Sequence, residues 1–85
     1  MRRSIADALD DHPDDDDERS PVSWAVALAD DCDACGMGEP RVVLTIEEVG
    51  RAGLGLIAHL SPPKARRLRA ALAAALKEIG EDPGP

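Results

Sequence analysis

The chain has 85 residues and a formal net charge of −7, so it belongs to the class of small single-domain proteins with room for one hydrophobic core. Its only aromatic side chain is Trp24, and valine, leucine and isoleucine must therefore fill that core. No apolar run approaches the ~18 residues that a membrane-spanning helix needs, and Asp7 interrupts any signal-peptide core. We expect a cytoplasmic protein without membrane contact.

The N-terminal residues 1–19 predict a disordered acidic tail. Residues 10–18 carry a block of like charges that repel one another, with too few apolar side chains to offset the entropy of ordering. Three arginines against eight acidic residues give this segment a formal charge of −5, which leaves −2 for the rest of the chain. We expect one folded domain at 20–80, close to neutral, and a frayed C-terminus at 81–85.

Residues 22–29 alternate larger and smaller apolar side chains. Trp24, Val26 and Leu28 lie at the even positions, and this period of two predicts a half-buried strand with those three side chains toward the core. A helix is the competing interpretation, because Ser20 and Pro21 would suit its first turn and alanines favour it. We favour the strand.

Two further strands are predicted after a turn-rich loop at 30–40. Residues 41–48 contain a β-branched run, with Leu44 at its centre. Residues 54–60 alternate again, with Leu56 among the inward side chains and Ile57 and His59 among the outward ones. The glycine-rich stretch at 50–55 predicts that these two strands form an antiparallel hairpin.

The strongest pattern is that of an amphipathic helix between Ser61 and Gly80. Ser61 is a good N-cap, Pro62 suits the first helical position, and Gly80 follows the last periodic residue. Apolar side chains at three- and four-residue spacing predict a face for packing on the sheet or for dimerisation: Leu68, Leu72, Ala75, Leu76 and Ile79.

These elements predict an α+β fold, with a three-stranded antiparallel sheet packed by one C-terminal amphipathic helix in the order β-β-β-α. So small a domain, with so few bulky side chains, often gains its missing stability by self-association. We therefore expect a homodimer.

The sharpest chemical feature is the pair Cys32 and Cys35, a Cys-x-x-Cys knuckle followed by Gly36, whose spacing suits one tetrahedral zinc ion. Strands one and three of the predicted sheet point the same way, so His59 approaches the knuckle and is the candidate third ligand. His12 and nearby aspartates are other donors, and two copies could share one ion through four thiolates. We favour an incidental thiol pair over a metal site, and a redox dithiol ranks last because the aspartates would raise a thiol pKa.

Four cations lie in the first half of the predicted helix, where the helix dipole disfavours positive charge. They are a candidate site for an anion or for nucleic-acid phosphate: Lys64, Arg66, Arg67 and Arg69. The alternative is a solvated face. We favour the solvated face, because the net charge is negative and aromatic side chains for base stacking are scarce.

No arrangement of residues in the sequence predicts an enzyme. Ser20, Ser23 and Ser61 fall in turn, strand or cap contexts without an adjacent base, and the glycines at 50–55 precede a strand and not a helix.

The run at 59–72, His-Leu-Ser-Pro-Pro-Lys-Ala-Arg-Arg-Leu-Arg-Ala-Ala-Leu, resembles short uncharacterised actinobacterial proteins in which a strand hairpin leads into a Leu-Ser/Thr-Pro, Ala-Arg-x-Leu helix. The resemblance covers residues 40–80 and implies a hairpin-plus-helix fold, and these proteins have no established activity to transfer. The sequence predicts a small non-enzymatic binding or regulatory protein that acts through protein–protein contacts as a homodimer. A zinc-stabilised module and an anion or nucleic-acid binder are the alternatives.

Overall fold

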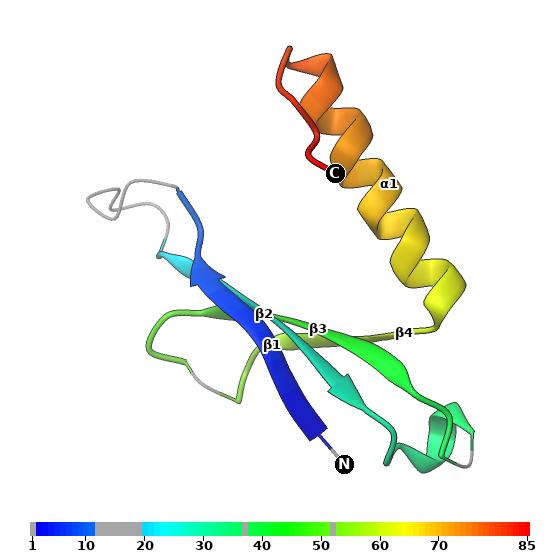
Figure 1. Cartoon of the computed structure of the whole chain (residues 1–85). Helices are drawn as coiled ribbons and strands as arrows, with labels where there is room; N and C mark the ends of the chain where they lie inside the picture. The colour runs from blue at the N-terminus through cyan, green and yellow to red at the C-terminus, as the bar shows by residue number, and fades with distance from the viewer. Residues whose placement is uncertain (1, 12–19, 37, 52) are drawn as a thin grey trace.

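The computed structural model describes residues 2–11, 20–36, 38–51 and 53–85. In this part of the chain four strands form one antiparallel sheet in the order β1-β2-β3-β4, and one helix follows them (Figure 1). The elements are β1 (Arg2–Leu9), β2 (Val22–Ala29), a 3₁₀ turn (Asp33–Cys35), β3 (Arg41–Glu48), β4 (Leu56–Leu60) and α1 (Pro62–Glu78). The predicted α+β class is confirmed, but the predicted number of three strands is wrong.

The additional strand is β1, which lies in the segment expected to be a tail. It pairs with β2 at the edge of the sheet, and its register shifts between Ser4 and Ala6, which leaves Ile5 as the extra residue of a β-bulge. All eight residues of β1 are exposed. A bulge and a fully exposed edge together remove the alternating pattern by which a strand is recognised. The acidic block at 12–19 lies outside the described residues.

The pairing of β2, β3 and β4 confirms the three predicted strands, although β4 begins at Leu56 and not at residue 54 as predicted. The pairing also gives the sheet two different faces. One face, called the apolar face below, carries three cross-strand rows: Trp24–Ile46–Leu56, Val26–Leu44–Ala58 and Leu28–Val42–Leu60. The opposite face, the knuckle face, carries the row Ala27–Val43–His59 and the pair Ala29–Arg41. The two most buried side chains of the described residues, Ala29 at 3% exposure and Val43 at 5%, both lie on the knuckle face.

Helix α1 begins and ends where its sequence signals predict. The Ser61 hydroxyl accepts a hydrogen bond of 3.5 Å from the Lys64 amide at the N-cap. At the other end Gly80 has a φ of +81°, and the Glu81 amide donates to the Leu76 carbonyl oxygen over 2.9 Å. This bond closes a Schellman motif, in which glycine takes the left-handed conformation that other residues avoid.

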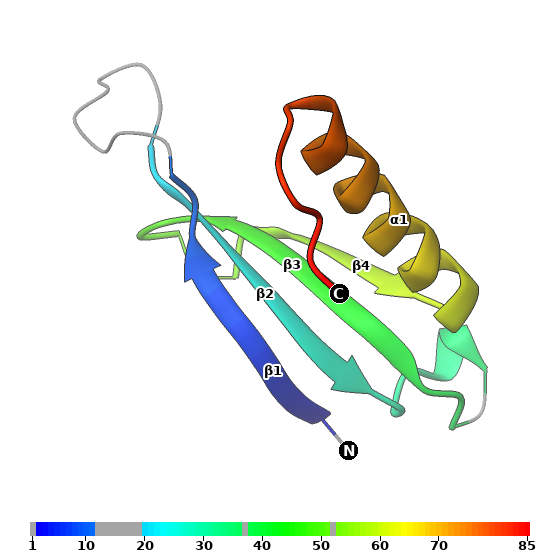
Figure 2. The same ribbon diagram turned by 45° about the horizontal axis from the view of Figure 1, so that its top comes forward.

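The expected packing of α1 on the sheet is not formed. The helix leaves the end of β4 and diverges from the sheet along its length (Figures 1 and 2). None of its residues is buried, and three of its large apolar side chains are exposed: Leu68 to 37%, Leu72 to 60% and Ile79 to 73%. The reason is the connection to β4, which consists of Ser61 alone and is followed at once by a proline of fixed φ. So short a link leaves no room for the helix to turn back flat onto the sheet.

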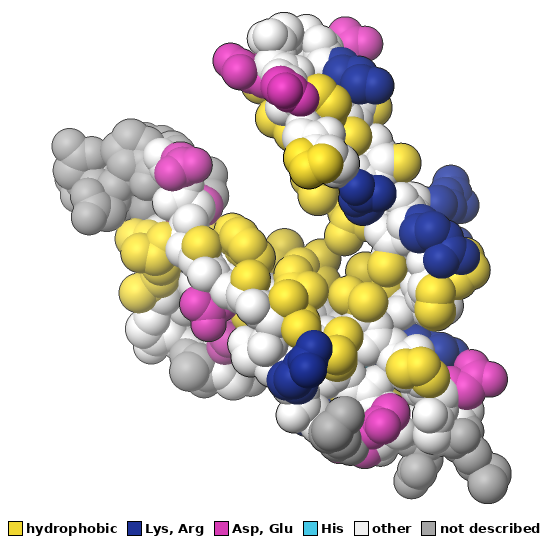
Figure 3. Space-filling model, viewed as in Figure 1, with side chains coloured by type: hydrophobic (Ala, Val, Ile, Leu, Met, Phe, Trp, Pro, Cys, Tyr) yellow, Lys and Arg dark blue, Asp and Glu magenta, His cyan; other side chains and the backbone are white. Residues whose placement is uncertain are grey.

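The result is an open, V-shaped molecule. Its radius of gyration is 15.0 Å, whereas a compact chain of this length is expected near 12 Å. Hydrophobic side chains gather on the sheet and on the side of the helix turned toward it, with open space between them (Figure 3). We call this space, bounded by the apolar face and α1, the groove. No helix of the described residues has the length and apolar character needed to cross a membrane.

Candidate metal centre

The knuckle between β2 and β3 brings its two thiols together through a single 3₁₀ turn. The Cys35 amide donates to the Cys32 carbonyl oxygen over 3.2 Å. In a 3₁₀ turn residues three apart are eclipsed, so the side chains of Cys32 and Cys35 lie one above the other. Gly36 follows with a φ of +113°, a conformation that favours glycine, and it lets the chain reverse directly after the second thiol.

The sheet brings His59 to this knuckle. β2 and β4 are both antiparallel to β3, so they run in the same direction and their ends lie at the same edge of the sheet. His59 pairs with Val43 on the knuckle face, and its Nδ1 atom lies 3.2 Å from the Cys35 sulfur. The predicted approach of His59 to the knuckle is confirmed.

Three donor atoms therefore converge on one point. The two sulfurs and a ring nitrogen of His59 all lie within 4.8 Å of one another, and the three residues could form a metal site. Around a tetrahedral zinc ion, sulfur atoms are about 3.8 Å apart and sulfur and nitrogen about 3.6 Å apart. The donors thus need to move by about 1 Å or less to take these positions.

Arg41 holds the knuckle against the sheet, a role that the sequence analysis missed. Its Nη2 atom donates to the Cys35 carbonyl oxygen over 2.7 Å, and its Nη1 atom donates to the Pro40 carbonyl over 3.1 Å and to a Glu39 carboxylate oxygen over 3.3 Å. A guanidinium can bind several oxygens at once because its donors diverge in one plane. The available signal was its position as the first strand residue after the loop that contains Cys35.

The electrostatic surroundings favour the protonated form of the Cys35 thiol. The pKa of the Cys35 thiol is raised above its ordinary value of 9.0, first by a hydrogen bond with Cys32 and then by partial burial and the negative charge of the Cys32 thiolate. The guanidinium of Arg41 acts in the opposite direction and is outweighed. A raised pKa is the reverse of what a reactive redox thiol needs. It also means that a metal ion must displace the Cys35 proton to bind.

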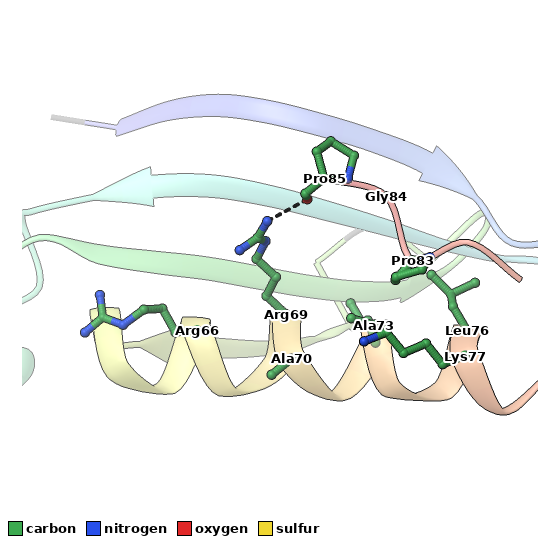
Figure 4. A pocket seen from close by; sticks show the side chains of 10 residues that line it. Arg66, Arg69, Ala70, Ala73, Leu76, Lys77, Pro83, Gly84 and Pro85 are labelled. Atoms are coloured by element: carbon green, nitrogen blue, oxygen red, sulfur yellow. Dashed lines mark hydrogen bonds between the residues drawn. The ribbon is translucent and has the colours of Figure 1, made fainter.

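The four cations proposed for anion binding do not share one face of α1. Successive helical residues turn by about 100°, which places Lys64 beside Arg67 and Arg66 beside Arg69 on opposite sides of the helix. Arg66 and Arg69 line a hollow of about 430 Å³ between α1 and the C-terminal segment. There Arg69 donates to the Pro85 carbonyl oxygen over 2.7 Å (Figure 4). Part of this positive charge is thus directed at the chain's own C-terminal segment.

Comparisons with known proteins found no matching family model, no matching curated protein and no matching solved structure. The interpretation of the site therefore depends on its own geometry.

Proposed function

We propose that this chain is a small non-enzymatic module for protein–protein contacts whose scaffold is stabilised by a zinc ion bound to Cys32, Cys35 and His59. The observation that carries the proposal is the convergence of two thiols and one imidazole from segments 24 residues apart. Thiolate and imidazole are the donors that zinc prefers, and they distinguish it from magnesium and calcium, which take oxygen ligands.

A bound zinc ion would supply the stability that this core lacks. Within the described residues only Ala29 and Val43 fall below one tenth exposure, and both are small or medium-sized side chains. A metal bridge between the knuckle and β4 would close a long loop of chain and hold the knuckle over these two residues. Among the described residues the cluster has three protein donors, so water would take the fourth coordination position.

A structural role suits this site better than a catalytic one. His59 is exposed, so the metal would face solvent, whereas hydrolytic zinc centres lie in cavities from which bulk water is excluded. The hollow along α1 and a second hollow, beside β1 and Glu47, are not lined by Cys32, Cys35 or His59.

The test is metal content and spectroscopy on the full chain, purified under reducing conditions without a chelator. We expect about one equivalent of zinc per chain, and its replacement by Co²⁺ should give the thiolate-to-cobalt charge-transfer band of a site with sulfur ligands. A Cys35→Ser variant should lose that band. Protein that retains its thiols yet binds neither zinc nor cobalt would overturn the proposal.

A further inference from the structure

The groove between the apolar face and α1 is a feature that the metal centre does not explain (Figure 3). We infer that it is filled by a second copy of this chain, with the helix of each copy lying on the apolar face of the other. The inference rests on the protein-contact part of the proposed function and does not depend on zinc.

Apolar side chains on both sides of the groove are exposed, and on the sheet they are exposed most at the end farthest from the connection to α1. On the sheet, the row most distant from the Ser61 connection is Trp24, Ile46 and Leu56, with exposures of 37%, 46% and 81%. On the helix, Leu72 and Ile79 are 60% and 73% exposed, whereas Leu76 is half-buried. Apolar surface of this extent on a soluble domain marks an interaction site.

The amount of exposed surface matches what a dimer needs. A compact monomer of this mass is expected to expose about 4,900 Å², whereas this chain exposes 6755 Å². The excess is about 1,900 Å², and a standard stable interface takes about 800 Å² from each partner. If half of the excess belongs to loops and chain ends, the remainder still suffices.

A second copy is the occupant that the two surfaces fit. Each copy carries both a helix stripe with exposed leucines and a sheet face that its own helix does not cover, and a two-fold axis pairs each stripe with the partner's sheet in one arrangement.

Closure of the helix onto its own sheet is opposed by the chain itself. The connection at Ser61 is a single residue. The C-terminal segment also folds back from the end of α1 into the space between helix and sheet (Figures 2 and 4). There Pro83 and Pro85 line a hollow together with Leu72 and Leu76. Any sheet that covers this part of the helix, the chain's own or a partner's, would have to displace the C-terminal segment, so the single-residue connection at Ser61 is what opposes closure within one chain.

The test compares two substitutions of neighbouring residues on β4 in the full chain. Leu56 points to the apolar face and Ile57 to the knuckle face, and they are 81% and 64% exposed. Neither side chain belongs to the buried core, so Leu56→Lys and Ile57→Lys should fold alike, which circular dichroism checks. Light scattering after size exclusion gives the mass of each, against 9.0 kDa for one chain.

We expect the natural chain and the Ile57→Lys variant to have twice the monomer mass. The Leu56→Lys variant should associate about 100-fold more weakly or worse, because a dimer would bury the new charge once in each copy. Trp24 emission should shift to shorter wavelength as the natural chain associates. A Cys35→Ser variant should still dimerise, which separates this inference from the zinc proposal. A natural chain that stays monomeric at all concentrations, or a Leu56→Lys variant that dimerises as tightly as Ile57→Lys, would overturn it.

Discussion

Removal of the third donor should abolish most of the stability that zinc provides. The chain has two histidines, His59 in the cluster and His12 outside the described residues, so His59→Ala and His12→Ala form a matched pair. Zinc binds the folded chain in preference to the unfolded one, and free zinc at 100 times the dissociation constant should add about 2.7 kcal/mol to the free energy of unfolding.

The corresponding change in melting temperature follows from the size of the chain. An unfolding entropy of about 2.1 cal/mol/K per residue gives about 0.18 kcal/mol/K for this chain, so the melting temperature should rise by about 15 °C. If His59→Ala lowers zinc affinity about 100-fold, the same zinc concentration adds only about 0.4 kcal/mol and about 2 °C.

The assay is thermal unfolding of reduced protein followed by circular dichroism, with and without zinc. His12→Ala should keep the full zinc-dependent rise, and His59→Ala should lose nearly all of it. Equal losses in the two variants would place the third ligand elsewhere. An unchanged rise in His59→Ala would show that the imidazole next to the knuckle takes no part in binding.

Three further predictions follow from the same structure. Because the pKa of the Cys35 thiol is raised, the thiol must lose its proton before it can bind a metal ion. At pH values below this pKa, zinc affinity measured by competition with a chelator should therefore increase about tenfold per pH unit for each proton that zinc displaces. A zinc affinity that does not change between pH 6 and pH 8 would contradict this. A Cβ at Gly55 would lie 2.5 Å from the Ile46 carbonyl oxygen, so Gly55→Ala should lower the free energy of unfolding by about 1–3 kcal/mol in denaturant titration, and unchanged stability would refute so close an approach. Ser61→Ala removes the side-chain acceptor for the Lys64 amide and should cost about 1 kcal/mol, seen as earlier loss of helical ellipticity on heating; an unchanged melting curve would show that the cap is not used.

The strands of the central sheet and the boundaries of the helix could be predicted because their signals are local. Residues 22–29 alternate in side-chain size, and β2 has those same bounds. Ser61 and Gly80 mark the ends of α1 by backbone chemistry that does not depend on the rest of the fold. The position of His59 also followed from local information, since the direction of each strand in a chain of hairpins places its end at a known edge.

The features that could not be predicted depend on geometry between elements. β1 carries a bulge at Ile5 and no buried side chain, so its sequence lacks the period of a strand. The periodic leucines of α1 show that the helix has an apolar face, but periodicity does not specify which surface covers it. That depends on the single-residue connection at Ser61, which directs the helix away from its own sheet. Arg41 was missed because its contacts to the knuckle arise only when the loop folds back.

The coordination shell of bound zinc is the most direct test of the account. X-ray absorption at the zinc edge, recorded on the reduced 85-residue chain with one equivalent of zinc, reports the identity of the bound atoms and their distances. We predict two sulfur atoms at about 2.3 Å and one imidazole nitrogen at about 2.0 Å, with a light oxygen donor completing the shell. A shell of nitrogen and oxygen atoms without sulfur would contradict the assignment of Cys32 and Cys35 as ligands.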